Sequence, residues 1–260
     1  MQIIKTDRLT GQQKKEIGHL IDECRSLYPI RTSFPYEDGS VFFLAYEECA
    51  SSIPVLVCAL ALIMPETDDF DETAECLAFT HPSFRKKGYF SAVFDEAGAE
   101  FEEISLLIPV DGQDPAVVPV LESLGAEYDS CEYRMELDLS LPCPNEAPAP
   151  SGRRLVCRSV NGPDSSVSYS FSLAADESRP IAVCRTASFG TGVCLYSFLV
   201  EENCRGRGLG EEALLSVIEI LRSRGNAVLF LHVSGDNDAA VSLYKKTGFR
   251  ITETLSYYLY

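Results

Sequence analysis

A strand, a glycine-rich loop and a helix follow one another between Leu195 and Leu215, and this order restricts the fold more than any other feature of the chain. The apolar run from Leu195 to Val200 is typical of a buried strand. The next segment is Arg205-Gly206-Arg207-Gly208-Leu209-Gly210. Beyond it, apolar residues recur at three- and four-residue spacing and Gly225 follows as a C-terminal cap, so the sequence predicts an amphipathic helix.

A glycine-rich loop that enters a helix is suited to hold a phosphate or pyrophosphate. Its backbone N–H groups are unpaired and lie near the positive end of the helix dipole. A Rossmann-type dinucleotide site would need GxGxxG spacing and an acidic residue about 20 positions further on, and a P-loop would need Gly-Lys-Ser/Thr. Neither pattern occurs, because the glycines fall at 206, 208 and 210 and no Lys-Ser or Lys-Thr follows. The loop by itself is also compatible with an ordinary turn.

The same order of elements occurs in the first half of the chain, which indicates an internal repeat. A strand at Cys76–Thr80 leads into a basic loop and a helical pattern, and Arg85 and Gly88 precede Arg205 and Gly208 by the same number of positions. The repeat continues with an apolar strand in each half, then with the matching segments 114–125 and 237–248. Each half ends in alternating, strand-like sequence, at 131–139 and at 251–260.

A proline-rich segment separates the two halves. Residues 141–150 contain four prolines, which predicts a stiff, extended connector. We therefore expect a first domain at 1–141, a linker at 142–152 and a second domain at 153–260. The first half begins with a helical pattern at 11–28, but the second half has no room for a counterpart. We therefore expect the first half to supply one side of the second domain.

The composition excludes several classes of protein. The formal net charge of −17 argues against nucleic-acid binding. The ten cysteines are scattered without a CxxC pair, and the three histidines form no cluster at ligand spacing, so we expect reduced thiols and no metal. The chain has no apolar run of about 18 residues and no signal-peptide pattern at its start, which predicts a cytoplasmic protein with no membrane partner.

Two motifs of the second half resemble the signatures of the GNAT N-acetyltransferases. Leu199-Val200 followed by the 205–210 loop resembles the family's acetyl-CoA motif, Arg/Gln-x-x-Gly-x-Gly/Ala. Asn237, Ala240, Tyr244 and Gly248-Phe249 resemble its second signature. The resemblance covers residues 154–260 well and 41–141 as a degenerate copy. It implies an α/β fold of two tandem GNAT-like domains, each a mixed β-sheet flanked by helices.

The resemblance also implies roles for individual residues. Acetyl-CoA would be the co-substrate, with its pyrophosphate on the backbone of Gly206, Gly208, Leu209 and Gly210 and with charge added by Arg205 and Arg207. In the family, backbone groups at the positions of Leu199 and Val200 pair with pantetheine after a bulge, as an added strand would. Asn237 would contact pantetheine or pyrophosphate, and Tyr244 would protonate the departing thiolate. The acceptor would be an amine of a small molecule or a peptide.

Other candidates have simpler interpretations beside the functional ones. His232 could be a general base, but a core histidine is the preferred interpretation. We interpret Glu201 and Glu202 as solvated loop charges rather than bases, and Cys204 as an ordinary loop residue rather than a reactive thiol. The base is therefore unassigned.

The first half departs from the family pattern at three positions. Phe90 replaces the last small residue of the motif, Leu121 stands at the position of Tyr244, and Ala126 stands at that of Phe249. We expect this half to be catalytically silent, although it keeps Pro82, Arg85 and Gly88. An acyl-CoA sensor without turnover and a transferase with another acyl donor remain alternatives, and the protein could be a monomer with an internal pseudo-dimer or a homodimer.

Overall fold

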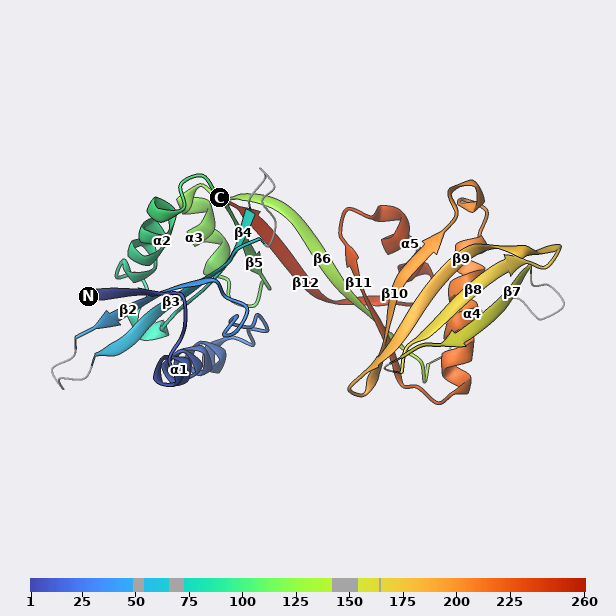
Figure 1. Cartoon of the computed structure of the whole chain (residues 1–260), viewed down its shortest axis with the longest axis horizontal. Coiled ribbons are helices and arrows are strands. Elements are labelled where there is room, and N and C mark those ends of the chain that lie inside the picture. Colours follow the sequence, from blue (N-terminus) through green and yellow to red (C-terminus); the bar gives the residue numbers. More distant parts are fainter. Residues whose placement is uncertain (49–53, 66–72, 142–153, 164) are drawn as a thin grey trace. The chain divides into compact units, whose positions relative to one another are not determined.

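The computed structural model describes residues 1–48, 54–65, 73–141, 154–163 and 165–260 (Figure 1). They form two compact units. Unit 1 comprises Met1–Ser130 together with Leu255–Tyr260, and unit 2 comprises Cys131–Thr254. The predicted linker at 142–152 lies outside the described residues, so the domain limits 1–141 and 153–260 stay a prediction. The division into compact units follows strand pairing instead.

Unit 1 is a mixed sheet with helices on both faces. In chain order its elements are β1 (Gln2–Thr6), α1 (Gly11–Leu27), β2 (Val41–Glu47), β3 (Val55–Ile63), β4 (Thr73–Thr80), α2 (Tyr89–Glu100), β5 (Ser105–Val110) and α3 (Val117–Leu124). The strands β1 to β4 pair antiparallel in sequence order, and β4 pairs parallel with β5. The expected helix at 11–28 and the expected strands are thus confirmed.

The core of unit 1 lies in two layers, because alternate strand residues point to opposite faces of the sheet. On one face, α1 packs on a cluster that includes Phe42 and Leu44. On the other face, α2 and α3 pack on a cluster that includes Phe43 and Leu60. A capping box fixes the start of α1, where Thr10 and Gln13 exchange hydrogen bonds between side chain and backbone.

Unit 2 repeats the arrangement with fewer elements. It contains β7 (Leu155–Asn161), β8 (Val167–Leu173), β9 (Asp176–Phe189), β10 (Gly192–Val200), α4 (Leu209–Ser223), β11 (Val228–Ser234) and α5 (Asp238–Lys246). The strands β7 to β10 pair antiparallel and β10 pairs parallel with β11. Both helices pack on one face of the sheet, which carries Leu229, Leu231 and Val233. Among the described residues, unit 2 begins with the hairpin of β7 and β8 and has no helix that corresponds to α1, as the sequence predicted.

The last strand of each half of the sequence pairs with the other half. In unit 2, residues 132–138 of β6 (Glu127–Asp138) run antiparallel to β11. In unit 1, residues 256–259 of β12 (Arg250–Leu259) run antiparallel to β5. Met135 and Leu137 of β6 are consequently buried in the core of unit 2. Each compact unit thus combines the strands of its own half with one strand segment from the other half of the chain.

Equivalent positions of the repeat have equivalent backbone conformations. A short 3-10 helix precedes the loop in both halves, at Pro82–Phe84 and at Glu202–Cys204. Gly88 and Gly208 then both adopt a left-handed conformation at the N-caps of α2 and α4, with φ of 84° and 73°. The internal repeat predicted from the sequence is confirmed in this respect.

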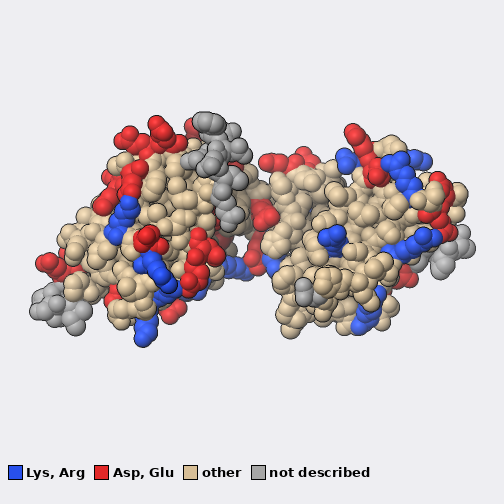
Figure 2. Space-filling model, in the orientation of Figure 1, with Lys and Arg blue, Asp and Glu red and all other residues tan. Residues whose placement is uncertain are grey.

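The two units differ in charge. Almost all of the excess of acidic over basic residues falls in residues 1–130. Figure 2 shows the Asp and Glu side chains spread over the surface of unit 1, which contains α1 and α2. Among the described residues, no helix is long and apolar enough to cross a membrane.

Candidate functional site

The strand β10 separates from β11 halfway along its length, and a bulge accompanies the separation. The two strands pair only from Gly192 to Cys194. Register with β9 then shifts between Tyr196 and Leu199, and Ser197 has a left-handed φ of 52°. Leu199 and Val200 still pair with β9 on one edge of β10. Their other edge, on the side of β11, is not paired with that strand. A strand edge without a β11 partner can accept an extended ligand as an additional strand.

The loop after β10 turns sharply into α4 on two left-handed glycines. Gly206 and Gly208 have φ of 69° and 73°, a conformation that other residues rarely adopt. Gly208 is the N-cap and has no side chain to bond the first N–H groups of the helix. A Cβ placed on Gly210 would lie 3.3 Å from Val200 Cγ2, so this glycine also permits close packing of α4 on β10.

The two arginines of the loop differ in their contacts. Arg205 Nε donates to the carbonyl oxygen of Val200 at 2.9 Å, which holds its guanidinium beside the end of β10. Arg207 is exposed, and its backbone carbonyl accepts a hydrogen bond from Arg154 Nη1 at 3.0 Å. Arg154 therefore brings a third guanidinium to this loop.

A buried ion pair anchors Arg154, and we did not anticipate it from the sequence. Glu212 in the first turn of α4 is 3% exposed, and its Oε2 accepts from Arg154 Nε at 2.9 Å. The Oε1 atom accepts from the backbone N–H groups of Arg154 and Leu155. Glu212 lies on the same helix face as Leu209 and Ser216, and this position was the only sequence signal for its burial.

We predict that Arg154→Ala destabilises the protein by about 2 kcal/mol. The substitution leaves the buried Glu212 carboxylate with two backbone donors but no cation, which is less costly than the complete loss of compensation in a buried pair. Chemical denaturation at neutral pH measures the loss. Arg158→Ala is the matched control, because Arg158 pairs with Glu177 on the surface, where both side chains are exposed. Equal stability of the two variants would contradict this role of Arg154.

Tyr244 lies on α5 in unit 2 and is a buried residue whose phenolic hydroxyl could act as a proton donor. Its ring packs 6.5 Å from Phe198, which follows the bulge, and 5.6 Å from Phe249. Burial raises the pKa of Tyr244 to about 12, so the phenol stays protonated at neutral pH. No described residue hydrogen bonds to its hydroxyl. The family roles of Tyr244 remain a prediction, which this environment permits.

Asn237 forms the N-cap of α5. Its side-chain oxygen accepts from the backbone N–H of Ala240 at 3.1 Å. The amide NH₂ group has no hydrogen-bond partner among the described residues and is exposed at the loop after β11. Only the donor end of Asn237 is therefore free to meet a ligand.

His232 does not lie in the core. That prediction was wrong, because the His232 side chain is 47% exposed and its Nδ1 lies 3.6 Å from Glu132 Oε2. The cause is strand alternation, since its neighbours Leu231 and Val233 point into the core. Glu201 pairs with Arg179 on the surface, as expected for a solvated loop charge. Cys204 is buried beside Asn203.

These residues fit a coenzyme A molecule in several respects. The loop provides left-handed glycines, an N-terminal helix turn without a side-chain cap, and arginines on either side. The β10 bulge and the separation from β11 provide a strand edge for an extended arm with amide groups. Within the described residues, no group of three or more His, Cys, Asp or Glu could hold a metal ion.

Sequence comparison finds similarity to acetyltransferases over part of the chain. Residues 135–249 match the model of the acetyltransferase (GNAT) family. Mycothiol acetyltransferase from Saccharomonospora viridis is 38% identical over 60 residues, 23% of this chain and 20% of that protein. The uncharacterized N-acetyltransferase YdgE from Bacillus subtilis is 43% identical over 58 residues, 22% and 37%. The matches thus span a fifth to two fifths of the relatives' lengths.

Solved structures resemble the whole chain in fold. A GCN5-related N-acetyltransferase from Sphaerobacter thermophilus aligns with a TM-score of 0.69 at 13% identity, over 99% of this chain and 95% of that one. A tandem GNAT protein from the clavulanic acid biosynthesis pathway aligns with a TM-score of 0.65 at 15% identity, over 100% and 98%. The whole chain therefore has the fold of tandem GNAT proteins, and residues 135–249 match the acetyltransferase (GNAT) family in sequence.

Proposed function

We propose that unit 2 transfers an acetyl group from acetyl-CoA to an amine of a small molecule or a peptide. The observation that carries this proposal is the combination at one strand end of the β10 bulge, the separation from β11 and the left-handed glycine loop. The backbone of 206–210 would hold the pyrophosphate, with Arg205, Arg207 and Arg154 adding positive charge. Leu199 and Val200 would pair with the pantetheine, and Asn237 would donate to it.

Acetyl-CoA, when bound, supplies an activated acetyl thioester. The acceptor amine, in its neutral form, forms the new C–N bond while the C–S bond breaks. Tyr244 then donates its phenolic proton to the departing thiolate, and water removes the extra proton from the amine nitrogen. Much of the acceleration would come from holding the two reactants together, since effective molarities of about 10⁵ M or more are available from good positioning.

A matched pair of glycine substitutions tests the proposal. Gly208→Ala places a methyl group on the phosphate loop, and Gly88→Ala does the same at the equivalent N-cap of unit 1. Both force alanine into a left-handed conformation at a cost of about 1–2 kcal/mol. We expect the KM for acetyl-CoA to rise about tenfold or more in Gly208→Ala only, because tenfold corresponds to about 1.4 kcal/mol of lost binding.

Steady-state release of coenzyme A with a panel of primary amines and peptides measures this difference. Chromatographic detection of free coenzyme A avoids interference from the protein's own thiols. Absence of turnover with tight binding of acetyl-CoA would favour the second candidate, a sensor that binds acyl-CoA without reaction. Turnover that Gly88→Ala weakens and Gly208→Ala does not would place the reaction in unit 1 and contradict the proposal.

A further inference from the structure

Unit 1 contains a cavity of about 350 Å³ where β4 separates from β5. The two strands pair only from Thr73 to Glu75, and the rest of β4 lines the cavity. Most of the lining is apolar and aromatic, with rings contributed by the loop after β4 and by α2: Phe84, Tyr89, Phe90 and Phe94. Small-molecule sites in proteins have this size and this mixture of a mostly apolar lining with a few polar groups.

The cavity differs from the corresponding region of unit 2 in ways that disfavour the binding of coenzyme A. The strand β4 has no bulge, since its register with β3 is continuous from Glu75 to Thr80. The Phe90 ring lines the cavity at the position that Gly210 has in unit 2. Asp114 stands where Asn237 does and puts a carboxylate in place of an amide. Unit 1 is also strongly acidic, which disfavours a ligand with several negative charges.

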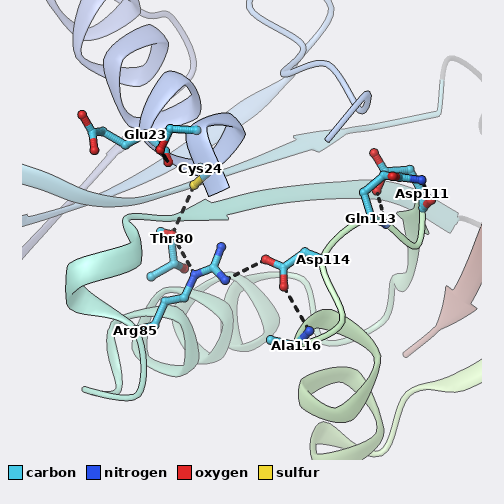
Figure 3. Close-up of polar contacts among 9 residues, drawn as sticks. Glu23, Cys24, Thr80, Arg85, Asp111, Gln113, Asp114 and Ala116 are labelled. Atoms are coloured by element: carbon cyan, nitrogen blue, oxygen red, sulfur yellow. Dashed lines mark hydrogen bonds and ion pairs between the residues drawn. The ribbon is translucent and has the colours of Figure 1, made fainter. Parts of the chain in front are cut away.

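An ion pair spans the two loops at the polar end of the cavity (Figure 3). Arg85 Nη1 lies 2.7 Å from Asp114 Oδ2, with the Asp114 side chain only 3% exposed. Arg85 Nε also donates to the carbonyl oxygen of Thr80 at 3.4 Å, as does the Cys24 thiol. Burial raises the pKa of Cys24, so this thiol remains a neutral donor. The pair therefore joins the loop after β4 to the loop before α3.

At this end of the cavity, the two aspartates already accept hydrogen bonds, and Arg85 is held in place by Asp114 and Thr80. The other oxygen of Asp114 accepts from the backbone N–H of Ala116 at 3.0 Å. Asp111 accepts backbone N–H bonds from three residues, Arg31, Thr32 and Gln113. Lys86, by contrast, lines the cavity and forms no ion pair with any residue that the structure describes. A ligand with an anionic head group would find Arg85 and Lys86, while its apolar part would meet the aromatic rings.

We propose that this cavity binds a small apolar monocarboxylate, such as a medium-chain fatty acid. The carboxylate lies at Arg85 and Lys86, and the chain lies among Phe84, Phe90, Phe94 and Leu121. Arginine suits this head group because its planar guanidinium presents several N–H donors to a carboxylate. Asp114 already offsets the charge of Arg85, so this end of the cavity suits a ligand with a single negative charge better than one with several. This site is independent of the reaction proposed for unit 2.

Calorimetric titration of the whole chain with decanoate, decanol and decyltrimethylammonium tests the head group and the apolar part separately. We expect one decanoate site per chain, with decanol at least tenfold weaker and the cation weaker still. Arg85→Gln should weaken decanoate binding about tenfold, since a charge-assisted hydrogen bond is lost. Arg205→Gln is the matched control at the equivalent position of unit 2 and should leave decanoate binding unchanged.

Lys86→Gln on the surface gives a second variant, with a smaller expected loss, in case Arg85→Gln fails to fold. Absence of decanoate binding to the folded wild-type chain would overturn the proposal. Equal affinities for decanoate, decanol and the cation would overturn the assigned head group, and a loss on Arg205→Gln would move the site to unit 2. Displacement of decanoate by acetyl-CoA in a Gly208→Trp protein would instead assign the cavity to coenzyme A.

Discussion

A fragment of residues 154–260, the second half of the sequence without β6, is expected not to fold. It lacks the strand that pairs with β11 from Glu132 to Asp138. It also lacks Met135, Leu137 and Leu139, which are 0%, 5% and 4% exposed in the core of unit 2. Loss of a buried large apolar side chain costs about 2–5 kcal/mol, and three such losses consume the roughly 5–15 kcal/mol that stabilises a domain.

Circular dichroism during thermal unfolding measures this result. A fragment of residues 127–254 is the matched control, because it keeps β6 with the rest of unit 2 and should show a cooperative transition. A cooperative transition of similar midpoint in the fragment 154–260 would contradict the exchange of strands. The comparison also tests the position of the domain boundary. The compact units divide at Ser130, whereas the proline-rich segment predicts a boundary at 142–152.

Tyr244→Phe is expected to lower kcat for acetyl transfer about 100-fold or more. The variant keeps the ring that packs against Phe198 and Phe249 but lacks the proton for the departing thiolate. The KM for acetyl-CoA should change little. Stability should change by less than about 1 kcal/mol, because no described residue bonds to the hydroxyl. Tyr169→Phe is the matched control, a buried tyrosine whose hydroxyl accepts from Arg224 instead.

The pH dependence gives a second test of Tyr244. Its pKa is raised to about 12 by burial, so the acid form is fully populated at neutral pH and is lost only as pH rises toward 12. The rate should therefore rise with pH as the acceptor amine becomes neutral and should show no alkaline decline near pH 9 or 10. An unchanged kcat in Tyr244→Phe, or the same loss in Tyr169→Phe, would contradict an acid role.

Much of the fold follows from local patterns that are legible in the sequence. The apolar periodicity gives the helices α1, α2 and α4 nearly to their ends. The glycines of the repeat identify left-handed positions, because Gly88 and Gly208 have no side chain to oppose a positive φ. The strand exchange does not follow, because β6 and β12 have the same alternating character and either could pair with β5 or with β11.

The backbone conformation of the candidate site follows from the sequence, whereas the contacts between side chains that are distant in sequence do not. The loop at 205–210 is continuous in sequence and recognisable as a motif. The partner of Glu212 is 58 positions away, at Arg154, so no local pattern reveals that ion pair. The exposure of His232 could have been inferred, since Leu229, Leu231 and Val233 alternate with it and are buried. The unit 1 cavity depends on how far β4 and β5 separate, which spacing alone does not determine.

The most direct test of the central claim is a count of acetyl-CoA sites by calorimetric titration. Wild-type protein is compared with Gly208→Trp and with Gly88→Trp, which place an indole at equivalent N-caps of unit 2 and unit 1. We predict one site per chain, lost in Gly208→Trp and retained in Gly88→Trp. Two sites, or a single site that only Gly88→Trp removes, would contradict the assignment of the coenzyme to unit 2, and no binding at all would contradict the acetyltransferase proposal.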